Sequence, residues 1–434
     1  MGKNLDINVH HLTRVEGHGN IVVRASDGKV ETCHLQIVET PRVFESMIEG
    51  LSWRDTSLLT CRICGICSVG HTTSSIKATD DAFGVQLTPQ ALALRKLMLL
   101  AEIIQSHVLH VYFLAAPDAF SAPSVIPLAA SHPDIVLRAL RLKKLGNVIC
   151  EAVAGRHVHP ISMVPGGFSY VPPKKDLQKV RQYLLSLKED IDVTVKTVAS
   201  IKDKFPGFER PREDVSLTRS DEYAFYDGKL MSSKAGVIEP RDYLNFIHEK
   251  CVPHSTSKHV HNVEASLAVG ALSRFNNNAK QLNARGKSAA DALGLAAPCC
   301  NPYYNNLAQT VEIAHCYDES VTLINQLLDM DLCEATLAPC VKPRAGRGVG
   351  LAEVPRGLLI HDYTYDDKGV CLKANCVIPT GMNLGNIDLD MQAYVPSVIN
   401  SRSQEQIAHD LEMLVRAYDP CISCSVHLLN VKWV

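Results

Sequence analysis

Two Cys-x-x-Cys pairs constrain this 434-residue chain more than any other feature of its sequence. Cys64 and Cys67 form the first pair, and Cys421 and Cys424 form the second. Two intervening residues let both sulfurs of a pair converge on one ion, and Gly65 permits the tight turn that this requires. If the two pairs act together, segments from near the two ends of the chain must meet in the fold.

The chain contains 15 cysteines and 18 histidines. An odd cysteine count argues against a disulfide framework, and the N-terminus lacks a secretory pattern, so we expect a cytoplasmic protein with reduced thiols. Metal ligation or redox chemistry is then the better interpretation of the clustered cysteines. The lone cysteines are expected to be small buried hydrophobic residues: Cys33, Cys150, Cys251, Cys316, Cys333 and Cys371.

Charge and hydropathy exclude several classes of function. Lys+Arg at 44 against Asp+Glu at 46 gives a net charge of −2, so no global field favours nucleic acid or an anionic membrane. No stretch approaches the 18 or so uninterrupted apolar residues of a membrane span. A hydrophobic content of 46% indicates a large core.

The predicted fold is mainly α with small β layers, an α+β class built on a large helical-bundle core. Residues 1–40 predict β-hairpin strands, and 206–242 predict a small β insertion. Residues 90–116 lack Pro and Gly and are apolar on nearly every face, so we expect a buried helix that places His107 and His110 inside. Further helices are predicted over 176–205, 303–330 and 403–420, the last capped by Ser403.

We expect one domain over residues 1–434, whose C-terminal segment, 419–434, binds metal. Structural zinc is the ordinary interpretation of two Cys-x-x-Cys pairs. Three details favour a redox-active transition metal instead: the pairs flank a chain with a large core, thiolates are soft ligands, and polar residues accompany each pair. These companions, which we expect in buried, apolar surroundings, are Arg62 and His71 at the first pair, and Asp419 and His427 at the second.

The motifs around both pairs resemble those of the large, catalytic subunit of nickel-iron hydrogenases. The paired segments read RICGICSVGH and DPCISCSVH. The other similar motifs follow in the family's order: Arg14-Val15-Glu16-Gly17-His18, Phe44-Glu45, Gly155-Arg156-His157-Val158-His159-Pro160, Asn301-Pro302-Tyr303, Pro355-Arg356-Gly357 and Val377-Ile378-Pro379-Thr380. The resemblance spans nearly the whole chain.

The resemblance implies that all four cysteines bind nickel. Cys64 and Cys421 are then terminal ligands, while Cys67 and Cys424 bridge nickel to an iron that carries carbon monoxide and cyanide. Heterolytic cleavage of dihydrogen needs such a metal pair and a nearby base.

Two candidates for the proton acceptor stay open. In one, the Cys421 thiolate takes the proton and passes it to Glu16; in the other, Arg356 acts directly as the base, although arginine is normally always protonated. Without the resemblance, Glu16 reads as a buried carboxylate paired with Arg14 or His18, and Arg356 reads as a surface ion pair.

The resemblance assigns supporting roles to four further residues. We expect His71 to hydrogen-bond a bridging sulfur and Asp419 to orient Arg356. Pro379 and Thr380 are expected to line the cyanide pocket, although a Pro-containing strand end would look the same.

A structural magnesium is expected near the C-terminus, at Glu45, His427 and the carbonyl of Cys376. A carboxylate and a carbonyl are suitable hard ligands, whereas an imidazole is less typical for magnesium.

The sequence departs from the family pattern in two places. The helix that carries an aspartate near the active site of many membrane-associated members reads Gln105-Ser106-His107 here, which resembles the soluble cytoplasmic branch. In the family, the precursor is usually cleaved after the last histidine, but Leu428–Val434 follow it here, so the chain is either unprocessed or keeps its tail.

No other cysteine set has iron-sulfur spacing, and no Gly-x-Gly-x-x-Gly follows a strand, so we expect neither an iron-sulfur cluster nor a nucleotide in this chain. The resemblance then implies that electrons leave through an iron-sulfur small subunit and further flavin or iron-sulfur subunits, to nicotinamide, deazaflavin or a heterodisulfide-linked flavin. The alternative is a structural scaffold, either zinc-binding or like the quinone-pocket subunit of complex I.

Overall fold

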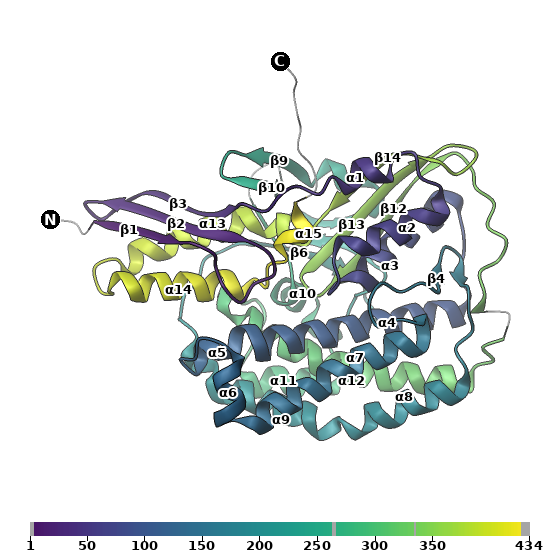
Figure 1. The fold of residues 1–434 in the computed structure, drawn as a ribbon, viewed down its shortest axis with the longest axis horizontal. Coiled ribbons are helices and arrows are strands. Elements are labelled where there is room, and N and C mark those ends of the chain that lie inside the picture. Colours follow the sequence, from purple (N-terminus) through teal and green to yellow (C-terminus); the bar gives the residue numbers. More distant parts are fainter. Residues whose placement is uncertain (1–3, 263–265, 334–335, 427–434) are drawn as a thin grey trace, which may run out of the picture.

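The computed structural model describes residues 4–262, 266–333 and 336–426, which form a helical layer beneath a mixed layer (Figure 1). The helical layer contains the long helices α4 (Pro89–Val108), α7 (Pro133–Ala154), α8 (Lys174–Ser186), α9 (Lys188–Ile201) and α12 (Asn305–Asp329). The mixed layer is built around the strands β12 (Gly346–Val354), β13 (Gly357–Tyr365) and β14 (Cys371–Val377), with α2 (Trp53–Thr60) and α3 (Ser68–Phe83) beside them. This arrangement confirms the predicted mixture of a helical core with small sheets.

The remaining helices are shorter or lie outside the bundle: α1 (Phe44–Ile48), α5 (Ala116–Ala119), α6 (Val125–Ser131), α10 (Ala271–Asn278), α11 (Ala284–Leu293), α13 (Pro379–Val398), α14 (Gln404–Ala417) and α15 (Ile422–Ser425). In Figure 1, α13 and α14 lie below the N-terminal strands, and α15 lies near the centre, between the layers. The short α15 therefore brings the end of the described chain into the middle of the molecule.

Three further sheets complete the structure. A five-stranded sheet has the order β1 (Leu5–Val9), β2 (Gly19–Ser26), β3 (Lys29–Ile37), β10 (Ser255–His261), β9 (His248–Val252). A four-stranded sheet has the order β11 (Leu267–Ala268), β6 (Glu213–Thr218), β7 (Lys229–Ser232), β8 (Gly236–Ile238), and β4 (Met163–Val164) pairs with β5 (Gly167–Phe168). Strands thus occur in both segments where the sequence predicts them.

Helix α4 is the buried centre of the bundle. It packs against α7 and α12, and His107 is fully buried, as its apolar surroundings predict. The helix continues through a π-helical segment, Leu109–Ala115. By length and hydropathy Pro89–Ala119 could cross a membrane, but 83% of its most apolar window is buried inside the protein, which is typical of a core helix.

The other predicted helices are found with one exception. Residues 176–205 do not form one helix, because the backbone of Leu187 leaves the helical region (φ −96°, ψ 5°) between α8 and α9. Leu187 is 2% exposed, so this break turns an apolar side chain into the core. At α14, Ser403 accepts from the backbone N–H of Gln406, whose side chain accepts from Ser403 N in return.

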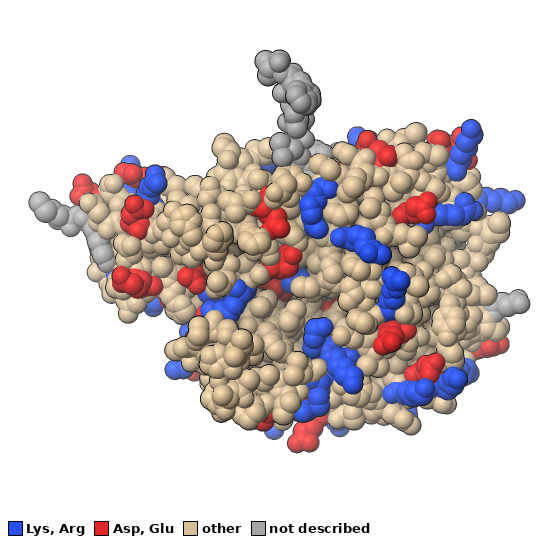
Figure 2. Space-filling view, viewed as in Figure 1, with Lys and Arg blue, Asp and Glu red and all other residues tan. Residues whose placement is uncertain are grey.

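The lone cysteines divide into two groups. Cys33, Cys150, Cys316 and Cys371 are buried as expected, whereas the same expectation is wrong for Cys251 and Cys333, which are exposed. Cys251 lies on β9, the edge strand of its sheet, and Cys333 lies beyond the end of α12. On the face in Figure 2, Lys and Arg are interspersed with Asp and Glu, in agreement with the near-zero net charge.

Helix α3 approaches β12 so closely that two strand positions have no room for a side chain. A Cβ atom on Gly348 would lie 2.0 Å from the carbonyl oxygen of Ala78, and one on Gly350 would lie 2.0 Å from that of Ser74. Since Cys67 precedes the first residue of α3, this contact also positions the first cysteine pair.

We predict that Gly350→Ala destabilises the protein by about 1–3 kcal/mol, because the new methyl group must displace helix backbone. Gly207→Ala is the control, since a Cβ there would meet nothing within 4 Å, and its effect should stay within about 0.5 kcal/mol. Thermal unfolding of the purified variants measures both. Equal melting temperatures of Gly350→Ala and Gly207→Ala would show that α3 and β12 can move apart to accommodate the methyl group without loss of stability.

Candidate metal centre

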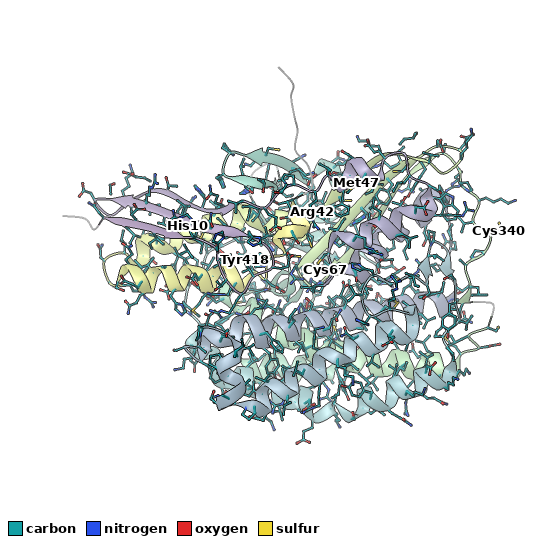
Figure 3. The ribbon with its side chains drawn as sticks, viewed as in Figure 1. His10, Arg42, Met47, Cys67, Cys340 and Tyr418 are labelled. Atoms are coloured by element: carbon teal, nitrogen blue, oxygen red, sulfur yellow. The ribbon has the colours of Figure 1, made fainter. Side chains whose placement is uncertain are left out.

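The four motif cysteines meet between the two layers of the molecule. Their sulfurs lie within 4.8 Å of one another, and Sγ of Cys64 is 3.5 Å from Sγ of Cys421. Each of the four side chains is at most 5% exposed. Figure 3 places Cys67 near the centre of the view, close to the end of β13, whereas Cys340 lies at the edge of the molecule. The convergence expected from the sequence is thus present.

Backbone contacts hold the second pair against the N-terminal segment. The N–H of Ile422 donates to the carbonyl of Glu16 at 2.9 Å. The Arg42 guanidinium donates to the carbonyls of Ile63, at 2.6 Å, and of Ser423. Arg42 therefore ties the two cysteine segments together. No local sequence pattern marks Arg42, because an arginine that binds backbone carbonyls has no characteristic neighbours in sequence.

Crowding of four buried sulfurs shapes their protonation. Hydrogen bonds from neighbouring thiols, Cys421 foremost, hold the pKa of Cys64 well below its usual value. Burial raises the pKa of Cys421 and Cys424 well above the usual value. The protein alone therefore favours one thiolate and resists the others, and a bound cation is what would stabilise a set of four. The donor set fits a soft transition metal.

Arg356 lies beside the sulfurs, 3% exposed. Its Nη1 is 3.1 Å from Sγ of Cys67, while Nε and Nη2 donate to the backbone carbonyl and the carboxylate of Asp419 at 2.9 and 3.0 Å. Burial opposes its charge, but Asp419 and the sulfurs raise the pKa of Arg356 well above its ordinary value. A surface ion pair, one expectation for Arg356, is therefore wrong.

Asp419 adopts a left-handed backbone conformation (φ 51°) just before the second pair. Its Oδ1 binds Arg356, and its Oδ2 accepts from Gln309 Nε2 at 3.1 Å. Arg356 Nη1 also reaches Ser106 Oγ at 3.5 Å, within the Gln105-Ser106-His107 stretch that carries no acidic residue. Asp419 is thus a carboxylate that contacts the guanidinium directly.

Glu16 reaches the second cysteine pair from the N-terminal segment. Its Oε2 accepts from Sγ of Cys421 at 3.2 Å and from the N–H of Ser423 at 3.1 Å, and its Oε1 accepts from the Ser423 hydroxyl. Pairing of Glu16 with Arg14 or His18 is wrong, because Arg14 pairs with Asp118 and His18 with Glu39. Glu16 is half-buried, so it joins the sulfurs to the outer part of the protein.

A small cavity of about 10 Å³ adjoins Cys67, Cys421 and Cys424. Its lining includes His71, Arg356, Pro379 and Thr380. Pro379 is the first residue of α13 rather than a strand end, and Thr380 Oγ1 accepts from the N–H of Cys421 at 3.0 Å. A cavity of this size holds about one water-sized molecule and excludes organic substrates, whose pockets are far larger.

His71 is buried beside this cavity, and burial lowers its pKa to about 4. Its Nδ1 lies 3.2 Å from Nε2 of His361. Nε2 is then the ring nitrogen that is left to form a hydrogen bond with a sulfur.

The three residues expected to bind magnesium are described in part. Glu45 is 5% exposed, and its Oε1 accepts from the N–H of Cys376 at 2.9 Å and from Lys258 Nζ at 3.4 Å. His427 lies outside the described residues. Glu45 and Cys376 are thus brought together, and Lys258 brings a positive charge to the same carboxylate.

Two further findings concern residues near the first pair. Arg62 is exposed, so its expected place in apolar surroundings is wrong.

Glu102 on α4 is fully buried and accepts from the N–H groups of Val69 and Gly70 at 2.7 and 2.9 Å, which fixes the start of α3. Burial raises the pKa of Glu102 to about 8. A lone carboxylate within the apolar 90–116 stretch is the signal that could have revealed it.

Comparison with known proteins identifies the family. The profile described as Nickel-dependent hydrogenase matches residues 42–132 and 267–427, more than half of the chain, and a profile described as HoxL-like matches residues 6–40. The chain belongs to the nickel-dependent hydrogenase family. It is therefore a nickel-dependent oxidoreductase, and its four buried cysteines are consistent with a nickel-iron centre.

Relatives match over almost the entire length of this hydrogenase chain. The alpha subunit of sulfhydrogenase 2 from Pyrococcus furiosus is 31% identical over 98% of this chain and 100% of its own. The beta subunit of the NAD-reducing hydrogenase HoxS from Cupriavidus necator is 29% identical over 96% of this chain and 94% of its own.

Solved structures support the same assignment. A NAD+-reducing NiFe hydrogenase is similar with a TM-score of 0.88 and 27% identity, over 97% of this chain and 99% of its own. The NiFeSe hydrogenase from Desulfovibrio vulgaris Hildenborough shares the fold, with a TM-score of 0.77 and 23% identity over 98% of this chain and 100% of its own.

We predict that Arg356→Lys lowers the turnover rate of dihydrogen oxidation about 10- to 100-fold while nickel and iron stay bound. A lysine ammonium cannot reproduce the planar fork that contacts Asp419 twice and Cys67 once. Dye reduction under hydrogen and metal analysis give the two readouts. Arg347→Lys, at a paired and more exposed arginine, is the control. Undiminished turnover in Arg356→Lys would contradict a role for the fork.

Proposed function

We propose that this chain is the catalytic subunit of a hydrogenase complex that cleaves dihydrogen reversibly and heterolytically into protons and electrons. The observation that carries the proposal is the buried group of four cysteine sulfurs within 4.8 Å, beside the Arg356 cation and the Glu16 carboxylate. Binding and splitting a small apolar molecule requires such a dry, enclosed site.

In this proposal Cys64, Cys67, Cys421 and Cys424 hold nickel, and Cys67 and Cys424 also hold iron with carbon monoxide and cyanide ligands. The bound metal pair supplies Lewis acidity toward dihydrogen. Pro379 and Thr380, which line the cavity, would contact the cyanide ligands. His71, whose Nδ1 lies 3.2 Å from Nε2 of His361, would donate from Nε2 to a bridging sulfur and so tune its basicity.

Cys421 and Glu16 form the proposed proton path. Cys421 accepts the proton at Sγ and donates it to Oε2 of Glu16, across a contact of 3.2 Å. The two Ser423 hydrogen bonds hold the carboxylate in place for this transfer. Arg356 serves as a fixed positive charge, oriented by Asp419, because its raised pKa disfavours action as a base.

We also propose a structural magnesium held by Glu45, His427 and the Cys376 carbonyl. Its support within the described residues is the approach of the buried Glu45 carboxylate to Cys376, with Glu249 bound to the same Lys258. Adjacent carboxylates around one ammonium group indicate a region built to hold positive charge.

The electron partners are proposed to be an iron-sulfur small subunit and further flavin or iron-sulfur subunits that deliver electrons to nicotinamide, deazaflavin or a heterodisulfide-linked flavin. The alpha- and beta-subunit names of the relatives, and the NAD-reducing relative in particular, support this class of complex. We propose a soluble, cytoplasmic location, supported by burial of the most apolar helix. A single domain is supported by the largest of the three core clusters among the described residues, which extends from Leu5 to Val426.

We predict about one nickel and one iron per chain, together with infrared bands from iron-bound carbon monoxide and cyanide, where protein does not absorb. Cys421→Ser should lose nickel or dihydrogen oxidation, because the hydroxyl is a poor soft ligand. Cys340→Ser is the matched control, since Cys340 is exposed and far from Cys67 (Figure 3). Zinc alone in the purified protein, or full activity in Cys421→Ser, would refute the proposal.

We predict that Glu16→Gln abolishes exchange of deuterium gas with solvent protons while nickel and iron stay bound. The amide can keep the hydrogen bond from the Ser423 N–H but cannot carry a proton. Mass spectrometry of the released gas measures exchange. Glu49→Gln, at an exposed carboxylate of the same N-terminal segment, should exchange normally. Normal exchange in Glu16→Gln would assign the proton path to another residue.

A further inference from the structure

A second group of metal-ligating side chains lies apart from the cysteines. His254, His259 and Asp388 each offer one ligand atom, and these atoms lie within 4.8 Å of one another. His254 stands in the turn between β9 and β10, His259 on β10 and Asp388 on α13. The cavity beside the cysteines is lined by none of the three. Figure 1 shows the β9–β10 hairpin at the upper edge of the molecule.

The carboxylate of this group is already oriented. Asp388 Oδ1 accepts from the backbone N–H of Leu35 at 2.8 Å, and Oδ2 lies 3.2 Å from Nε2 of His254. The His34 ring stacks on that of His254, with centroids 4.3 Å apart, and so limits its rotation. The backbone hydrogen bond to Oδ1 thus holds the carboxylate in place, and Oδ2 faces an imidazole nitrogen. Hydrogen bonds of this kind orient the side chains that bind metals.

His259 supplies the observation that points to a ligand. The residue is 5% exposed, and its Nε2 is buried without a hydrogen-bond partner among the described residues. An unsatisfied buried polar atom is costly to the folded state, so this nitrogen calls for a partner that the described residues do not supply. Burial lowers the pKa of His259 to about 4, so the ring is neutral near pH 7, the form that binds metals.

We propose that His254, His259 and Asp388 bind one divalent transition-metal ion, with zinc as the best match. Two imidazoles and one carboxylate are a frequent three-residue zinc set, and a water molecule completes a tetrahedron. Magnesium and calcium prefer oxygen ligands throughout, so they fit this site poorly. The His254 side chain is 26% exposed, which leaves a route for the ion and room for the water.

The position of this site indicates a structural role. Metal binding would join the β9–β10 hairpin to α13. Helix α13 begins at Pro379, and its second residue, Thr380, binds the Cys421 backbone about two turns before Asp388. On β10, Lys258 precedes His259 and pairs with Glu45. The ion would thus fasten two elements that support the metal centre from outside.

Zinc titration of the purified hydrogenase complex tests the proposal. After chelator treatment, nickel and iron are measured to verify that the cysteine site stays filled, and zinc is then added against a competing colorimetric chelator. We expect one strong zinc equivalent per chain, weakened at least about 100-fold in His259→Gln and Asp388→Asn. His248→Gln, which removes a histidine of β9 outside the cluster, should bind zinc as the wild type does.

Two further measurements distinguish loss of the zinc site from misfolding of a variant and from binding of the metal by the cysteines. His254→Gln alters the partly exposed ligand and serves if the buried variants fail to fold; retained nickel and activity show that a variant is folded. Cobalt bound in place of zinc should give d–d absorption bands without thiolate charge-transfer bands. Charge-transfer bands, equal zinc affinity in variants and wild type, or no zinc uptake by the wild type would each overturn the proposal.

Discussion

The structure depends on holding the C-terminal cysteine segment in the interior, against residues of the N-terminal part of the chain. Three kinds of contact do this: the backbone bond from Ile422 to Glu16, the Arg42 guanidinium between the carbonyls of Ile63 and Ser423, and the Arg356–Asp419 pair. Each takes polar groups at least partly out of water, which is costly unless these groups find partners. The contacts supply most of those partners, although Nε of Arg42 has none among the described residues, and they hold the four sulfurs together in the interior.

Polar groups within the helical layer reinforce this arrangement. Arg274 is fully buried and pairs with Glu312 at 2.6 Å and with Glu353 at 3.0 Å, while His107 also contacts Glu312 at 2.7 Å. Since Glu353 lies on β12 and Glu312 on α12, the network joins the two layers. One helical turn earlier, Gln309 bonds Asp419, so the same helix also supports the metal centre. Buried ion pairs of this kind specify geometry more than they add stability.

The sequence was informative where local pattern and chemistry coincide. The apolar 90–116 stretch predicts a core helix, Ser403 marks the start of α14, and the motif order places the cysteines, Glu16 and Arg356 in one family of sites. It was uninformative where distant parts of the chain decide the outcome. The break at Leu187, the carbonyl contacts of Arg42 and the role of Glu102 beneath α3 all depend on tertiary neighbours. Exposure of Arg62 was missed for the same reason, because a residue next to a buried cysteine can still point outward.

The dependence of the centre on both ends of the chain also sets an order of events during synthesis. The helical layer and the first cysteine pair leave the ribosome while Cys421 and Cys424 are still to be made. Until then the cavity lacks two of its lining residues, Cys421 and Cys424, and Glu16 lacks the Ser423 groups that hold its carboxylate. Cys64 and Cys67 therefore lack their partner sulfurs in a nascent chain until the segment that carries Cys421 and Cys424 has been made and has packed against them.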